Sequence, residues 1–124
     1  MGQMTITGGA GFIGSNLAKM AHEKGWGVTI LDNLSTGLQT TVNELADLGI
    51  KVIIGDIRDR DVLNHCLANS TVVVHLAAQV SVSASVKDPQ QTIDININGT
   101  QNVIQACLEN DVHNLIVASS SAVY

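Results

Sequence analysis

Short apolar, β-branched runs alternate along the chain with stretches in which apolar residues recur every three or four positions. The runs are typical of strands and the helical spacing is typical of amphipathic helices. The predicted strands cover residues 4–7, 28–31, 52–54, 71–76 and 115–118. The predicted helices cover residues 12–24, 40–48, 59–68 and about 91–110, with Asp59 as an N-cap. A Ser/Val-rich loop that ends near Pro89, the sole proline, precedes the last helix.

This strict alternation predicts an α/β fold with a doubly wound parallel sheet of five strands. Right-handed crossovers between parallel strands place helices on both faces of such a sheet. The run 71–76 is apolar without alternation, as a strand covered on both faces should be. We therefore expect residues 1–124 to form one Rossmann-type domain.

Composition narrows the function classes. The 124 residues are 45% hydrophobic, 14% charged and 2% aromatic, with a formal net charge of −5. Nucleic-acid-binding proteins need a basic surface and aromatic rings for stacking, so we expect no nucleic acid as a partner. No apolar run reaches membrane-spanning length and no signal peptide is evident, so we expect a cytoplasmic protein. Cys66 and Cys107 are expected as buried thiols. The histidines lack ligand spacing, so no metal is expected.

A glycine pattern lies between the first predicted strand and the first predicted helix. Gly8, Gly11 and Gly14 follow a G-x-x-G-x-x-G spacing. Gly8 suits the tight turn, Gly11 the close approach of a pyrophosphate, and Gly14 the packing of helix on strand. The phosphates would then lie over free N–H groups at the positive end of the helix.

Asp32 ends the second predicted strand at the separation from these glycines that an adenine-ribose ligand requires. Its carboxylate can accept hydrogen bonds from the ribose hydroxyls. A 2′-phosphate there would be repelled, because no Arg or Lys occurs between Asp32 and Lys51. The sequence thus favours NAD over NADP as cofactor.

Six segments together resemble the nucleotide-sugar epimerases and dehydratases of the extended short-chain dehydrogenase/reductase superfamily, most of all their UDP-glucose 4-epimerase branch. They span the chain in the family's order: TGGAGFIG (7–14), LDNLSTG (31–37), GDIRD (55–59), HLAA (75–78), NINGT (96–100) and SSSAVY (119–124). The resemblance implies NAD as cofactor and a nucleotide sugar of the UDP-glucose/UDP-galactose type as substrate.

The resemblance also implies roles for individual residues. The pyrophosphate would lie against Gly8, Gly11, Phe12, Ile13 and Gly14, and the adenosine ribose against Asp32, Asn33, Leu34 and Ser35. Asp56 and Ile57 would flank the adenine, and Leu76, Ala77 and Ala78 the nicotinamide ribose. Asn96 would brace the sheet and the cofactor site, and Ser120 would contact the sugar 4-OH as the catalytic candidate. From the residues alone, 76–78 could be a packed strand end, Asn96 a polar helix residue and 119–121 a polar turn.

The sequence also departs from the family's pattern. Ser121 and Ala122 stand where dehydratases usually carry an acidic pair, which favours an epimerase. No YxxxK pair occurs, and Tyr124 matches the tyrosine of the Val-Tyr motif, not the base. We therefore expect the first part of a longer enzyme, inactive alone. A dehydratase or decarboxylase of the same family, a non-catalytic NAD-binding module, and pairing into a homodimer through the long helix stay open.

Overall fold

Five parallel strands form one sheet in the computed structural model, which describes residues 2–78 and 82–118. The strand order is β3-β2-β1-β4-β5, with β1 in the centre. The strands are β1 (Gln3–Thr7), β2 (Gly27–Asp32), β3 (Lys51–Ile54), β4 (Val72–His75) and β5 (Asn114–Val117). The predicted doubly wound parallel sheet is confirmed, and each predicted strand lies within about two residues of its observed bounds.

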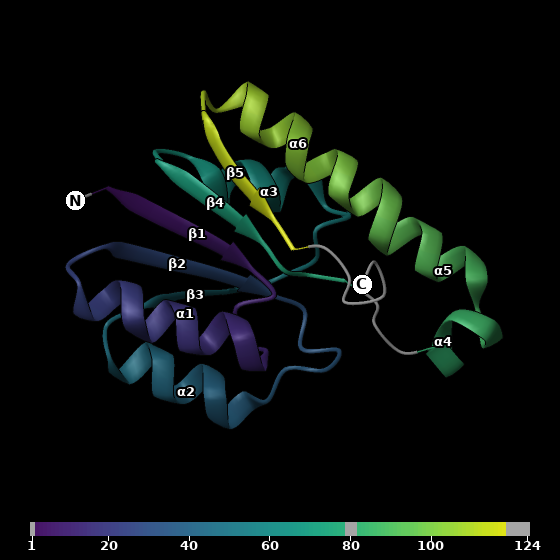
Figure 1. Ribbon diagram of the computed structural model, residues 1–124, viewed down its shortest axis with the longest axis horizontal. Coiled ribbons are helices and arrows are strands. Elements are labelled where there is room, and N and C mark those ends of the chain that lie inside the picture. The colour runs from purple at the N-terminus through teal and green to yellow at the C-terminus, as the bar shows by residue number, and fades with distance from the viewer. Residues whose placement is uncertain (1, 79–81, 119–124) are drawn as a thin grey trace.

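Helices cover both faces of the sheet (Figure 1). On one face, α1 (Phe12–Glu23) and α2 (Gln39–Asp47) lie over β1, β2 and β3, and on the other α3 (Arg60–Leu67) and α6 (Gly99–Glu109) lie side by side. Each face has its own apolar core, because successive strand residues point to opposite sides. Ile6 and Ile30 belong to the first core; Leu31, Val73 and Val103 belong to the second.

Local signals account for where helix α3 begins. The Asp59 carboxylate accepts hydrogen bonds from the backbone N–H groups of Asp61 (3.0 Å) and Val62 (3.3 Å). These are N–H groups that lack a partner within the helix. Asp59 is therefore the N-cap that the sequence predicted.

The long helix predicted over residues 91–110 is continuous but not uniform. It begins two residues earlier, as α5 (Pro89–Ile93), passes through a π-helical turn η1 (Asp94–Asn98), and continues as α6. Proline suits this first turn because its missing N–H would have no helical acceptor there, and Asp88 caps the turn by accepting from Gln91 N at 3.0 Å. The apolar periodicity carries no sign of the π-turn.

A short helix, α4 (Val82–Lys87), lies within the stretch predicted to be only a Ser/Val-rich loop. That part of the prediction is wrong. Six residues are too few for periodicity to reveal, and serine and valine are weak helix formers. In the structure α4 contacts α5, the segment that directly follows it (Figure 1).

Both cysteines are buried free thiols, as predicted. Burial raises the pKa of Cys66 to about 11, so its thiol stays protonated at neutral pH. Among the helices of the described residues, none has the length and apolar character needed to cross a membrane.

Candidate cofactor-binding site

The turn between β1 and α1 is folded tightly against the end of β4. Gly8 has φ +71°, and a Cβ on it would lie 2.9 Å from the backbone nitrogen of Ala77. Its N–H donates to Leu31 O at 2.7 Å, and its carbonyl accepts from Gly11 N at 3.2 Å. A side chain at this position would therefore meet main chain that cannot move aside.

Gly14 lets the first turn of α1 sit directly on this loop. A Cβ there would lie 2.5 Å from Gly8 O and 2.8 Å from Gly9 Cα. The predicted close packing is thus present, but against the glycine turn itself. Gly9, which sequence analysis missed, packs on β2, since a Cβ on it would overlap the side chain of Ile30. The double glycine of the motif was the available signal.

The N-terminus of α1 is left open. Its N-cap is Gly11, which has no side chain with which to satisfy the first helical N–H groups. Phe12 and Ile13 follow with exposed fractions of 85% and 68%. Open N–H groups at the positive end of a helix suit an anion such as a pyrophosphate.

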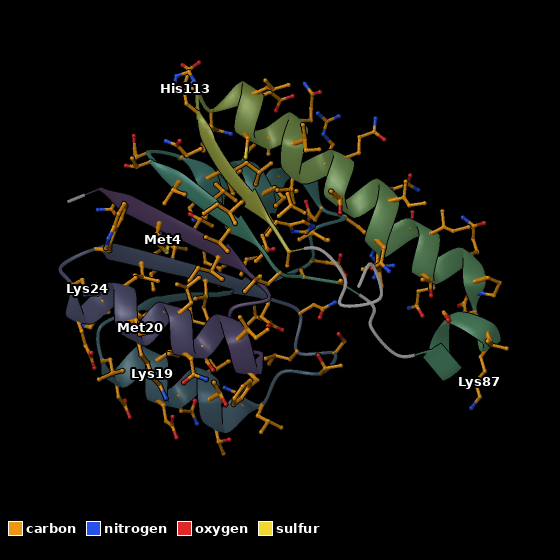
Figure 2. The ribbon with its side chains drawn as sticks, viewed as in Figure 1. Met4, Lys19, Met20, Lys24, Lys87 and His113 are labelled. Atoms are coloured by element: carbon orange, nitrogen blue, oxygen red, sulfur yellow. The ribbon has the colours of Figure 1, made fainter. Side chains whose placement is uncertain are left out.

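Asp32, the last residue of β2, is buried beside this turn with 8% exposure. Its Oδ2 accepts from Ala10 N at 3.0 Å and its Oδ1 from Leu34 N at 2.7 Å. Two backbone donors leave part of the carboxylate's four-site acceptor capacity unused. Among the described residues, no Lys or Arg forms an ion pair with Asp32. Of the lysines labelled in Figure 2, Lys19 lies on α1, Lys24 directly after its end, and Lys87 on α4.

The loop after β2 folds back over Asp32. Leu34 has φ +62°, a strained conformation for a residue with a side chain, and this turn directs its N–H to the carboxylate. Asn33 Oδ1 accepts from Ser35 N at 3.0 Å. Gly37, also missed by sequence analysis, comes so close that a Cβ on it would lie 3.2 Å from Asp32 Oδ1.

Asp56, two residues beyond β3, is surrounded by donors. Its Oδ1 accepts from Arg58 N (2.9 Å) and Nε (3.0 Å), and its Oδ2 from Arg58 Nη2 (2.8 Å) and Asn33 Nδ2 (3.2 Å). The hydrogen bonds from Arg58 lower the pKa of Asp56 to about 2. Ile57 is only 5% exposed, and its side chain packs where a Cβ on Gly99 would be, against the long helix.

A buried hydrogen-bond chain ties the ends of β1 and β4 to the long helix. Thr7 Oγ1 lies 2.6 Å from His75 Nδ1 and accepts from Leu76 N (3.1 Å) and Ala77 N (3.2 Å). His75 Nε2 lies 3.0 Å from Thr100 Oγ1, whose proton goes to Asn96 O at 2.7 Å.

The directions in this chain follow from the protons available. The Thr100 hydroxyl donates its one proton to the Asn96 carbonyl, so it can only accept a hydrogen bond from His75. His75 Nε2 is therefore the donor. Burial lowers the pKa of His75, so the ring is neutral, and Nδ1 accepts from the Thr7 hydroxyl. The backbone N–H groups of Leu76 and Ala77 are therefore held by the Thr7 side chain of β1, and the Asn96 carbonyl belongs to the same hydrogen-bond chain.

The sequence model of the NAD dependent epimerase/dehydratase family matches residues 4–124. The chain belongs to this family. A protein of Methanocaldococcus jannaschii, provisionally named a UDP-glucose 4-epimerase, is 40% identical over 96% of the chain and 38% of its own length. The UDP-N-acetyl-alpha-D-glucosaminuronate decarboxylase of Bacillus cytotoxicus is 39% identical over 96% of the chain and 36% of its own length.

A solved structure has the same fold. The UDP-glucose 4-epimerase of Stenotrophomonas maltophila, crystallised with NAD and formylated UDP-arabinopyranose, superposes with a TM-score of 0.91 at 32% identity, over all of this chain and 38% of that one. The predicted family and the Rossmann-type fold are thereby confirmed. The chain spans little more than a third of the length of these relatives.

In this family member, the fold brings most of the predicted site residues to one edge of the sheet. The glycine turn, Asp32, the loop after it and residues 76–78 all follow the carboxyl ends of β1, β2 and β4, where doubly wound sheets bind ligands. Ser120 and the rest of the SSSAVY segment lie outside the described residues. Within the described ranges, no three His, Cys, Asp or Glu side chains gather as metal ligands would.

Proposed function

We propose that this chain forms the NAD-binding part of a nucleotide-sugar epimerase of the UDP-glucose 4-epimerase type. The observation that carries the proposal is Asp32: a buried carboxylate, held by main-chain N–H groups beside a glycine turn, with acceptor capacity to spare. Family membership and the NAD-containing structure of the Stenotrophomonas relative support the same cofactor.

A different group of residues would hold each part of the cofactor. The pyrophosphate would lie on the glycine turn, where any side chain at Gly8 or Gly14 would meet main chain. The ribose hydroxyls would donate to Asp32, flanked by Asn33, Leu34 and Ser35. Residues 76–78 would border the nicotinamide ribose, and the two alanines leave room for it. Asp56 would meet the adenine.

The proposed preference for NAD rests on charge. A 2′-phosphate would meet the Asp32 carboxylate, which is itself only 8% exposed, so the repulsion between the two charges would be poorly screened. Calorimetric titration should show NAD binding at least about tenfold more tightly than NADP. Asp32→Ala should weaken NAD binding and narrow that ratio, and an unchanged ratio would refute the assigned role of Asp32.

The proposed reaction inverts the configuration at C4 of the sugar. When bound, NAD supplies the hydride acceptor for oxidation of the 4-OH and the hydride donor for re-reduction of the 4-keto sugar on its other face. Ser120 would contact the 4-OH and hold it for proton removal. This assignment rests on its place in the SSSAVY segment.

A decarboxylase is the second candidate, because the Bacillus cytotoxicus relative is nearly as similar as the epimerase-like one. A substrate panel separates the two. In the enzyme that contains this NAD-binding part, we expect UDP-glucose to be converted to UDP-galactose and a UDP-uronic acid to keep its carboxyl group. Loss of CO2 from a UDP-uronic acid would support the decarboxylase instead.

We also propose that two copies pair through the long helix. Ile97, Ile104 and Leu108 are 61%, 44% and 68% exposed along η1 and α6, which is unusual for a run of large apolar side chains. Light scattering should give the mass of a dimer. Replacing Ile97 and Leu108 by glutamate should give a monomer that still binds NAD.

A further inference from the structure

Arg58 makes three of the four hydrogen bonds that the Asp56 carboxylate accepts. Its backbone N–H and Nε bind Oδ1, and Nη2 binds Oδ2. A carboxylate offers about four lone-pair directions in its plane, so only one of them is left to another residue. Asn33 Nδ2 occupies that direction, with the longest of the four bonds at 3.2 Å.

The other side of Arg58 is anchored to the long helix. Its Nη1 lies 3.6 Å from Asp94 Oδ2 at the start of the π-turn, and Asp94 in turn accepts from Asn98 Nδ2 at 3.0 Å. The main chain between Asp56 and Arg58 is held as well, since Asn102 Nδ2 donates to Ile57 O at 3.3 Å. The guanidinium is therefore fixed from two sides, and it fixes the carboxylate in turn.

This arrangement limits how Asp56 can meet a ligand. A donor such as the exocyclic amine of adenine can reach only the direction that Asn33 now occupies, at Oδ2. We propose that Arg58 is a positioning residue for adenine recognition: it holds Asp56 so that this single acceptor direction faces the amine, and Asn33 gives way when the amine binds. The inference rests on the proposed cofactor site. It goes beyond that site by giving a role to Arg58, which acts through Asp56 and is not itself proposed to contact the cofactor.

The test compares NAD with nicotinamide hypoxanthine dinucleotide, in which an oxo group replaces the amine. Dissociation constants are measured by calorimetry on the full chain of the protein. We expect the wild type to bind NAD about tenfold more tightly than the analogue, the factor that one hydrogen bond to a charged group provides. In Arg58→Gln the ratio should fall to about twofold or less. In Arg58→Lys, which keeps the charge but not the planar fork, it should fall as well.

Arg60→Gln is the matched control. Arg60 also pairs with a carboxylate, Glu109 at 2.9 Å, but on the surface between α3 and α6. In Arg60→Gln, the ratio of the dissociation constants of the two dinucleotides should equal that of the wild type.

Three results would overturn the inference while leaving the proposed cofactor in place: equal weakening of both dinucleotides in Arg58→Gln, an unchanged ratio in Arg58→Lys, or no discrimination by the wild type. A wild-type protein that binds neither dinucleotide would overturn the proposed function, and the role of Arg58 with it. Circular dichroism of each variant separates these results from loss of the fold.

Discussion

Two aspartates at the ends of neighbouring strands are held in opposite ways. Asp32 is buried and its carboxylate is bound by backbone N–H groups of Ala10 and Leu34. Asp56 is more exposed, at 27% of its side chain, and most of its partners are side-chain donors from Arg58 and Asn33. The Asp32 carboxylate is thus positioned by main-chain groups. The Asp56 carboxylate is positioned mostly by side chains, which a single substitution can remove.

The largest expected effect comes from disturbing the main chain that holds Asp32. Gly8→Ala places a methyl group 2.9 Å from Ala77 N, in a backbone conformation that disfavours side chains, so we expect a loss of about 3 kcal/mol in unfolding free energy. Gly25→Ala is the matched control. Gly25 has φ +92° but nothing within 4 Å of its Cβ position, so the loss should be only about 1 kcal/mol. Equal losses in urea denaturation would show that close approach to β4 is unimportant.

Removing the carboxylates themselves should give a smaller contrast. Asp32→Ala leaves the N–H groups of Ala10 and Leu34 without acceptors in a buried site, and we expect a loss of about 2 kcal/mol. Asp56→Ala releases donors that can turn to water, so its loss should be about 1 kcal/mol or less. Asp32→Asn keeps one acceptor oxygen, so its loss of unfolding free energy should lie between those of the two alanine variants. A larger loss for Asp56→Ala would reverse the comparison.

The same contrast explains what the sequence could predict. The role of Asp32 could be predicted from the sequence, because the glycine spacing and the end of a strand together determine that backbone N–H groups lie beside its carboxylate. Arg58 was missed because an Asp and an Arg two residues apart look like any solvated pair. Its importance depends on Asp94 and Asn102, some 40 residues away. The side-chain burial of Ile57 was missed for the same reason, since it depends on the helix that packs over it.

Acid titration should distinguish Asp56 from an ordinary surface aspartate. Its pKa is lowered from 3.8 to about 2, so the stabilisation is complete above pH 3.8 and is lost as the pH falls through about 2. The difference in unfolding free energy between wild type and Asp56→Asn should be constant above pH 5 and shrink below pH 4. Solvent screening limits it to about 1 kcal/mol. A difference that does not change between pH 5 and pH 3 would contradict the lowered pKa.

The smallest expected effect compares two ion pairs of nearly equal length. Arg58 lies 2.8 Å from Asp56 and Arg60 lies 2.9 Å from Glu109, so distance alone predicts equal strength. The first pair is less exposed, and its guanidinium binds both carboxylate oxygens, whereas the second pair is more open to solvent. Double-mutant cycles with Arg→Gln and acid→amide replacements should give about 0.8 kcal/mol of coupling for the first and about 0.3 kcal/mol or less for the second. Equal couplings would mean that the two-point geometry at Asp56 contributes nothing to stability. The effect of Arg58 would then be confined to ligand binding.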